Sequence, residues 1–166
     1  EITPTVEIRP SPHGNRAKCL QRLVRLGLPV PKTVALGFDT VRAIAGGRLP
    51  DMAALLGVFG ENALLSVRSS SQMADWGGPG TILNIGMTDA KAADLAQAHG
   101  VSAADALYVG FIRSYAVDVL RLDADGFEGP MTPRLAKAEF EQEMEEPFPQ
   151  DPAEQLAEVL KSMARA

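Results

Sequence analysis

The sequence predicts an α+β fold in which several helices flank a small sheet. Two short apolar stretches, residues 63–68 and 81–86, have strand character and are separated by a polar, glycine-rich segment. Most of the remaining chain carries apolar residues at helical spacing, bounded by capping residues and by glycine or proline. With 166 residues, 46% of them hydrophobic, the chain is long and apolar enough to bury a core.

The first part of the chain is predicted to contain a lead-in, a helix, a strand and two short helices. Residues 1–13 include three prolines and are expected to form an extended lead-in. A helix over residues 16–26 is expected to end at Gly27. A short strand over residues 33–38 follows, and Asp51 is expected to cap the second of two short helices.

The part after the two strands is predicted to be helical. Thr88 is expected to cap an alanine-rich helix that ends near residue 100, and Ser102 with Asp105 resembles a capping box that opens a long helix. Residues 133–166 form a helical C-terminal segment, acidic over 139–146, whose last helix reaches the final residue without a stop signal. That ending indicates a chain cut from a longer protein. The long helix is expected to bury a stripe of Leu107, Tyr108, Phe111, Tyr115, Val119 and Leu122.

Composition limits the classes of function. The formal net charge of -5 argues against a nucleic-acid binder, and an aromatic content of 5% leaves little material for base stacking. The single cysteine, Cys19, cannot form an intrachain disulfide, which suits a cytosolic protein. No apolar run reaches membrane-spanning length and the N-terminus lacks the pattern of a signal peptide. We therefore expect a cytoplasmic protein.

Arg68 is the sharpest candidate for a binding residue. It ends the strand over 63–68 and stands between serines, where a guanidinium can bind phosphate through two hydrogen bonds. A strand-end arginine can equally face water or an internal carboxylate, so both interpretations stay open.

The loop that follows could approach a phosphate closely. Glycines at 77, 78 and 80 allow close approach of backbone N–H groups, and the Thr81 hydroxyl adds a donor. Pro79 has no N–H, and the spacing matches neither the P-loop nor the dinucleotide fingerprint. An ordinary hairpin loop is the alternative.

Two cations, Arg16 and Lys18, lie in the first turn of the helix over 16–26, where the helix dipole disfavours positive charge. An anionic ligand at the helix N-terminus would offset that cost, while the alternative is side chains that reach into solvent. His13 and His99 are not spaced for a metal site. The acidic residues of 139–146 are expected to cover a solvated helix face, and no converging carboxylates suggest a Mg²⁺ site.

Four stretches, in order along the chain, carry a resemblance to a known family. They are GNRAKCLQRLVRLGLPVP (14–31), LLSVRSSSQMADWGGPGTILNIG (64–86), GFIRSYAVDVL (110–120) and PFPQDPAEQL (147–156). Together they resemble the N-terminal ATP-binding region of the pyruvate phosphate dikinase family and, less closely, that of phosphoenolpyruvate synthase. The second and fourth stretches are the specific ones, and the fourth favours the dikinase.

The resemblance implies an ATP-grasp-like nucleotide site for ATP with Mg²⁺. In that family the β-phosphoryl group of ATP passes to a histidine on a swivelling domain and then to pyruvate, giving phosphoenolpyruvate. Arg68 falls on the family's phosphate-binding arginine and Arg16 on its ATP-binding lysine. Gly77 and Thr81 match the ends of its Gly-Met-Met-Asp-Thr loop. The implied ATP-binding residues are Arg16, Arg68, Gly77, Gly78, Gly80 and Thr81.

The resemblance also implies partners beyond residues 1–166, which would be the N-terminal part of the ATP-binding domain. The second half of the ATP-grasp unit would carry the metal ligands and much of the adenine pocket, and a phosphohistidine domain would follow. An apolar face left by the missing half would favour self-association. Alone, this chain is expected to bind ATP weakly or not at all and to catalyse nothing; we assign it no catalytic residue.

Three departures from the family favour a second interpretation, a non-catalytic binding or regulatory relative with a degenerate nucleotide site. Arginine replaces lysine at position 16, which keeps the charge but changes the geometry. The loop at 78–80 loses an acidic residue and gains a proline, and Val109-Gly110 stands in place of an arginine pair.

Overall fold

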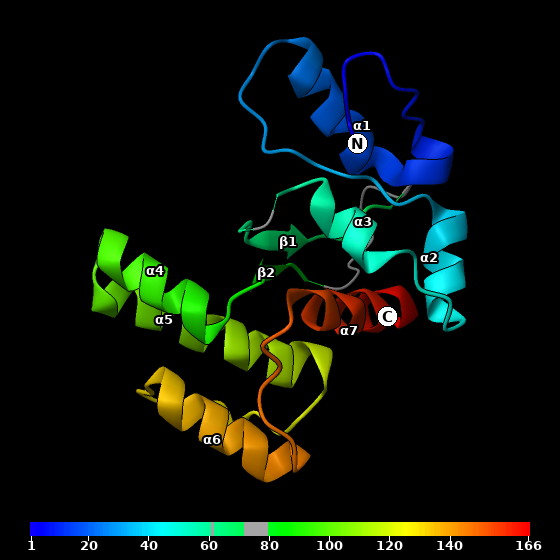
Figure 1. The fold of residues 1–166 in the computed structure, drawn as a ribbon. Coiled ribbons are helices and arrows are strands. Elements are labelled where there is room, and N and C mark those ends of the chain that lie inside the picture. The colour runs from blue at the N-terminus through cyan, green and yellow to red at the C-terminus, as the bar shows by residue number, and fades with distance from the viewer. Residues whose placement is uncertain (61, 72–79) are drawn as a thin grey trace.

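The structure is a computed structural model that describes residues 1–60, 62–71 and 80–166. In this part of the chain, helices surround one antiparallel pair of strands (Figure 1). The α-helices are α1 (Pro10–Arg25), α2 (Phe38–Ala45), α3 (Met52–Gly57), α4 (Asp89–His99), α5 (Val101–Arg113), α6 (Pro133–Met144) and α7 (Pro152–Arg165). A π-helix (Ser114–Val119), a 3₁₀ turn (Asp125–Phe127) and the strands β1 (Leu65–Val67) and β2 (Ile82–Ile85) complete the list. The predicted α+β class with a minimal sheet is confirmed.

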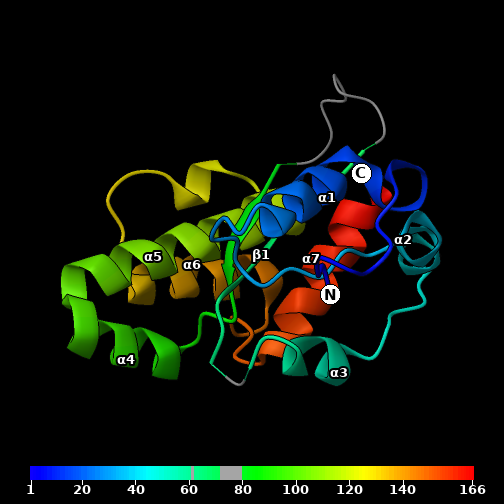
Figure 2. The same cartoon turned by 90° about the horizontal axis from the view of Figure 1, so that it is seen from above.

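The two strands pair with a defined register. Leu65 lies opposite Ile85 and Val67 opposite Ile82, with an irregularity between the two pairs. Such a small sheet is not stable alone and needs helices packed against it. Helices α5 and α7 both contact β2, and α7 also lies beside α2 and α3 (Figure 2). Helices α4 and α5 turn back on each other at Gly100, and α6 packs on α5.

An aromatic cluster forms the centre of the main core. Phe148 lies in the irregular segment between α6 and α7, with its side chain buried. Its ring centroid is 5.2 to 6.1 Å from those of four other aromatic rings, mostly edge to face, an arrangement that adds to the stabilisation from burial alone. Those rings belong to Tyr108, Phe111, Tyr115 and Phe140.

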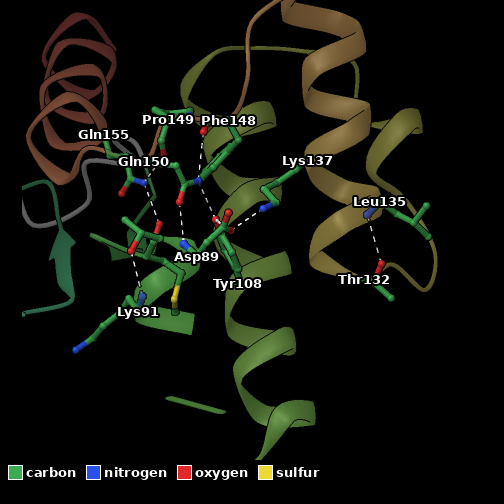
Figure 3. Close-up of polar contacts among 12 residues, drawn as sticks. Asp89, Lys91, Tyr108, Thr132, Leu135, Lys137, Phe148, Pro149, Gln150 and Gln155 are labelled. Carbon is green, nitrogen blue, oxygen red and sulfur yellow. Dashed lines mark hydrogen bonds and ion pairs between the residues drawn. The ribbon is translucent and has the colours of Figure 1, made fainter. Parts of the chain in front are cut away.

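Gln155 connects helix α7 to the end of β2. Its side chain is fully buried, accepts a hydrogen bond from the Gly86 N–H at 2.8 Å, and donates to the carbonyls of Met87 at 2.9 Å and Pro149 at 2.8 Å (Figure 3). A buried amide is tolerated in a core only when its hydrogen-bonding groups are paired in this way. The stretch PFPQDPAEQL is therefore a packing element: it fills the core and fastens α7 to the sheet.

Most sequence-predicted helices are confirmed, with their caps. The side chains of Asp51, Thr88, Thr132 and Asp151 each accept a hydrogen bond from a first-turn N–H of α3, α4, α6 and α7, respectively. The acidic side chains of the run over 139–146 are exposed, as predicted, apart from half-buried Glu139; Phe140 in the same run is buried and Met144 is half-buried. No helix among the described residues is long and apolar enough to cross a membrane.

Three element predictions are wrong. Residues 33–37 form no strand, since no strand among the described residues pairs with them; the N–H of Ile2 bonds to the Thr33 carbonyl, and α2 begins at Phe38. Ser102 is not a cap, because Gly100 is the capping residue of both α4 and α5, and its φ of 90° makes the turn between the two helices. The extended lead-in is shorter than predicted, since α1 begins at Pro10.

The predicted long helix is divided. It is α-helical only to Arg113 and continues as a π-helix over Ser114–Val119. Its buried stripe is confirmed at Tyr108, Phe111, Tyr115 and Val119; Leu122 is half-buried, and Leu107 is 41% exposed.

We predict that Phe148→Ala lowers the free energy of unfolding by about 3–5 kcal/mol, because it removes the ring that contacts the four others. Urea denaturation followed by circular dichroism measures the change. Leu135→Ala, on the exposed face of α6, is the control and should cost less than about 1 kcal/mol. Equal costs for the two variants would contradict a core centred on Phe148.

A polar network beside this core makes stability depend on pH. Asp89 accepts hydrogen bonds from Lys137 at 2.5 Å and from the Tyr108 hydroxyl at 2.8 Å, and Gln150 bonds to both Tyr108 and the Asp89 N–H (Figure 3). Burial favours a raised pKa for Asp89, but the bonds from Lys137 and Tyr108 together outweigh it and hold the pKa below its ordinary value of 3.8.

We predict that Asp89→Asn reduces stability at neutral pH and that the difference from wild type disappears in acid. A depressed carboxyl pKa contributes stability above its unfolded-state value, and the contribution is lost as pH falls through the folded-state value. Unfolding free energies of both proteins between about pH 7 and pH 2.5 would show the difference fading below about pH 4. A difference that is constant over this range would contradict the ionised pair.

Candidate functional site

One end of the small sheet carries three of the sequence-predicted site residues. Arg68 follows the last residue of β1, and Gly80 and Thr81 precede the first residue of β2. Because Val67 pairs with Ile82, these residues flank the same end of the strand pair. All three are exposed. Their exposed side chains leave a guanidinium and a hydroxyl directed to solvent at this end of the sheet.

The start of helix α1 meets this end of the sheet. Gly14 has φ 80° and ψ 164°, so it interrupts α1 and the regular helix begins after it. The N–H of Asn15 donates to the carbonyl of Ser71 at 2.8 Å, and the Arg16 guanidinium donates through Nη1 to the carbonyl of Ser69. Arg16 is thereby bonded to the residue next to Arg68, although 53 positions separate Arg16 from Ser69 in the sequence.

Ser70 fits against Gly14. Its Oγ donates to the carbonyl of His13 at 3.0 Å and accepts from the N–H of Ala17 at 3.4 Å. A Cβ at position 14 would lie 2.2 Å from this Oγ, a distance no side chain can accept. Glycine is required here both by the close approach and by its positive φ.

The structure thus brings Arg16, Arg68, Gly80 and Thr81 into one region, and they come from two distant parts of the chain. The other two predicted ligand residues, Gly77 and Gly78, lie outside the described residues. Arginine side chains carry further N–H donors beyond the one that Arg16 uses on Ser69. An anion with several oxygens suits this set of donors.

Lys18 does not join this region. Its ammonium group donates to the carbonyl of Ile8 at 2.8 Å and to Oε1 of Gln21 at 3.2 Å, so it holds the lead-in. The partners of Lys18 among the described residues are thus oxygens of the chain itself. The N–H groups of Asn15 and Ala17 also bond to residues 70 and 71, which shows that protein groups already occupy part of the helix N-terminus.

The sequence patterns assign no role to the serines at 69–71 or to Asn15. Their contacts are long-range, and the available signal was only the position of three serines directly after a strand-end arginine. That signal does not indicate which segment the serines contact.

Two described cavities lie away from this region. One, of about 650 Å³, lies at the opposite end of the sheet. Its lining includes Ala63, Gly86 and the first residues of α4 and α7. The other, of about 480 Å³, lies along the π-helix and includes Arg113 and Gly110. Val109, which stands beside Gly110 at the site of the family's arginine pair, is buried. Among the described residues, the candidate site is a cationic surface on which Arg16 and Arg68 are exposed.

The two histidines do not form part of a metal-binding cluster among the described residues. Nδ1 of His13 lies 3.4 Å from the backbone N–H of Arg9, and His99 is exposed at the end of α4. Within residues 1–60, 62–71 and 80–166, no three His, Cys, Asp or Glu side chains are grouped to hold a metal ion.

The chain matches no protein-family model, and no curated protein is significantly similar to it in sequence. The resemblance to the dikinase family therefore enters below as a proposal.

We predict that Gly14→Ala separates α1 from the end of β1 and lowers the free energy of unfolding by about 1–3 kcal/mol, because of the positive φ and the contact with Ser70. Amide hydrogen exchange at Asn15 and Ala17, together with urea denaturation, measures both effects. Gly110→Ala is the matched control: it lies within α5 with open space around it, and the substitution should stabilise by about 1 kcal/mol. A neutral Gly14→Ala would refute the close contact.

Proposed function

We propose that this chain supplies phosphate contacts of an ATP-grasp-like, cytoplasmic phosphotransferase domain similar to that of pyruvate phosphate dikinase, where it acts as the N-terminal subdomain. The single observation that carries the proposal is the meeting of Arg16 with the segment of Arg68 at the sheet end that also holds Thr81. These residues were selected from separate stretches of sequence, so their convergence supports a common ligand.

The chemistry of this region fits a polyphosphate. Two exposed guanidinium groups and a hydroxyl offer charged and neutral hydrogen-bond donors. Phosphoryl transfer depends mainly on positioning and on neutralising the charge of the phosphate oxygens. Arg16 and Arg68 would bind and orient the phosphate chain, and ATP would supply the group that is transferred.

Magnesium is not assigned to residues of this chain. The described residues at the sheet end are cationic or hydroxylic, and hard divalent cations need carboxylate or carbonyl oxygens. If the proposal holds, the metal ligands and the phosphohistidine domain belong to other parts of the protein.

A non-catalytic binding relative is a second candidate, favoured by one observation. Val109, at the position of the family's arginine pair, faces the core, and Gly110 beside it has no side chain to offer a phosphate. Such a relative would bind ATP at the same surface without turning it over.

We predict weak, site-specific binding of Mg-ATP to this chain, with a dissociation constant of roughly millimolar order, visible as saturable amide shifts at residues 14–16, 68–71 and 80–81 in a two-dimensional NMR titration. Arg68→Ala should weaken binding by about tenfold or more, because a hydrogen bond to a charged group contributes about 1.5–3 kcal/mol.

The control is Arg134→Ala, which removes the same charge from α6 on the far side of α5. It should leave the affinity unchanged. No localised shifts with a protein that contains the complete domain, or equal effects of the two substitutions, would sink the proposal. Binding with no phosphoryl transfer by a protein containing the complete domain would favour the non-catalytic candidate.

A further inference from the structure

We propose that Ser70 is a positioning residue: it caps helix α1 from the end of β1 and so fixes Arg16 and Arg68 as a pair. This inference rests on the proposed function, because the pair matters only if both arginines contact one anion. It assigns a role to a residue that neither the sequence pattern nor the resemblance singled out.

The first step is the cap itself. A helix leaves its first N–H groups without internal partners, and the residue before the first turn normally supplies a side-chain acceptor. In α1 that position is Gly14, which has no side chain. The Ser70 hydroxyl occupies the space of the missing Cβ and accepts from the N–H of Ala17, while Ser71 accepts from Asn15. The residue that caps this part of α1 is therefore Ser70, 53 positions away from Ala17 in the sequence.

The second step is the connection that this cap makes. The same hydroxyl donates to the carbonyl of His13, so Ser70 bonds on both sides of Gly14. Because Ser70 is held against Gly14, the carbonyl of the neighbouring Ser69 lies within reach of the Arg16 guanidinium and accepts its hydrogen bond. Three consecutive residues, 69–71, thus each bond to the start of α1.

The third step concerns what else could hold the two arginines. Helix α1 and the lead-in have their own small core of Ile2, Ile8 and Ala17, separate from the main core. Among the described residues, no buried apolar side chain belongs to both cores, and the contacts that join α1 to the segment after β1 are hydrogen bonds. Since Arg68 sits immediately before the three serines, any shift of this joint changes the spacing of the two guanidinium groups.

The test is a double-mutant cycle on Mg-ATP affinity, read by NMR, using wild type, Ser70→Ala, Arg16→Ala and the double variant. We expect Ser70→Ala to weaken binding by about tenfold alone and to have almost no further effect in the Arg16→Ala background, since it acts through that arginine. In the ligand-free protein, the amide of Ala17 should exchange faster with solvent. Ser102→Ala, an exposed serine in the first turn of α5, is the control and should change nothing.

The possible results distinguish failure of the positioning role of Ser70 from failure of the proposed function. Additive effects of the two substitutions, or wild-type affinity in Ser70→Ala, would overturn the positioning role while leaving the proposed function intact. Absence of any localised ATP shift in a protein that contains the complete domain would overturn the proposed function and this inference with it. If Ser70→Ala does not fold, Ser70→Gly removes the same hydroxyl and relieves any crowding at Gly14, and the same cycle applies.

Discussion

Helix α7 and the segment before it carry the interactions on which the main fold depends. Phe148 fills the space between α5 and α6, and a few residues later Gln155 bonds to the end of β2. A two-stranded sheet has too little buried surface to persist alone, so its position is set from outside. The buried amide of Gln155 provides that constraint, and its three hydrogen bonds specify one seating of α7 on the sheet.

The candidate site lies at the other end of the same strands, where the packing is different. The hydrogen bond from Gly86 to Gln155 holds the end of β2, and the pairing register then sets the position of β1. The paired strands bring Arg68 beside Thr81. Helix α1 then joins through hydrogen bonds to residues 69–71 rather than through the main core. Regions held by few buried apolar contacts open at lower free energy than the core. A ligand bridging α1 and β1 would stabilise this joint, which links binding to local order.

The basic residues of α1 have different tasks despite their adjacent positions. Lys18 and Arg25 donate to backbone carbonyls of the lead-in, and Gln21 does the same while fully buried. Arg16 alone among these side chains reaches the sheet end. Lys18 and Arg25 therefore serve to hold residues 1–8. The number of cationic residues on α1 is larger than the number that a ligand at the sheet end would meet.

The sequence by itself determined most of the helices, several of their caps and both strands, because caps, glycine stops and apolar periodicity act over a few residues. It also singled out Arg16, Arg68, Gly80 and Thr81. Only the tertiary structure decided that residues 33–37 find no strand partner, that Lys18 bonds to the lead-in, and that Ser70 caps α1. These outcomes depend on which distant segment supplies a hydrogen-bond partner, and a local pattern carries no information on that choice.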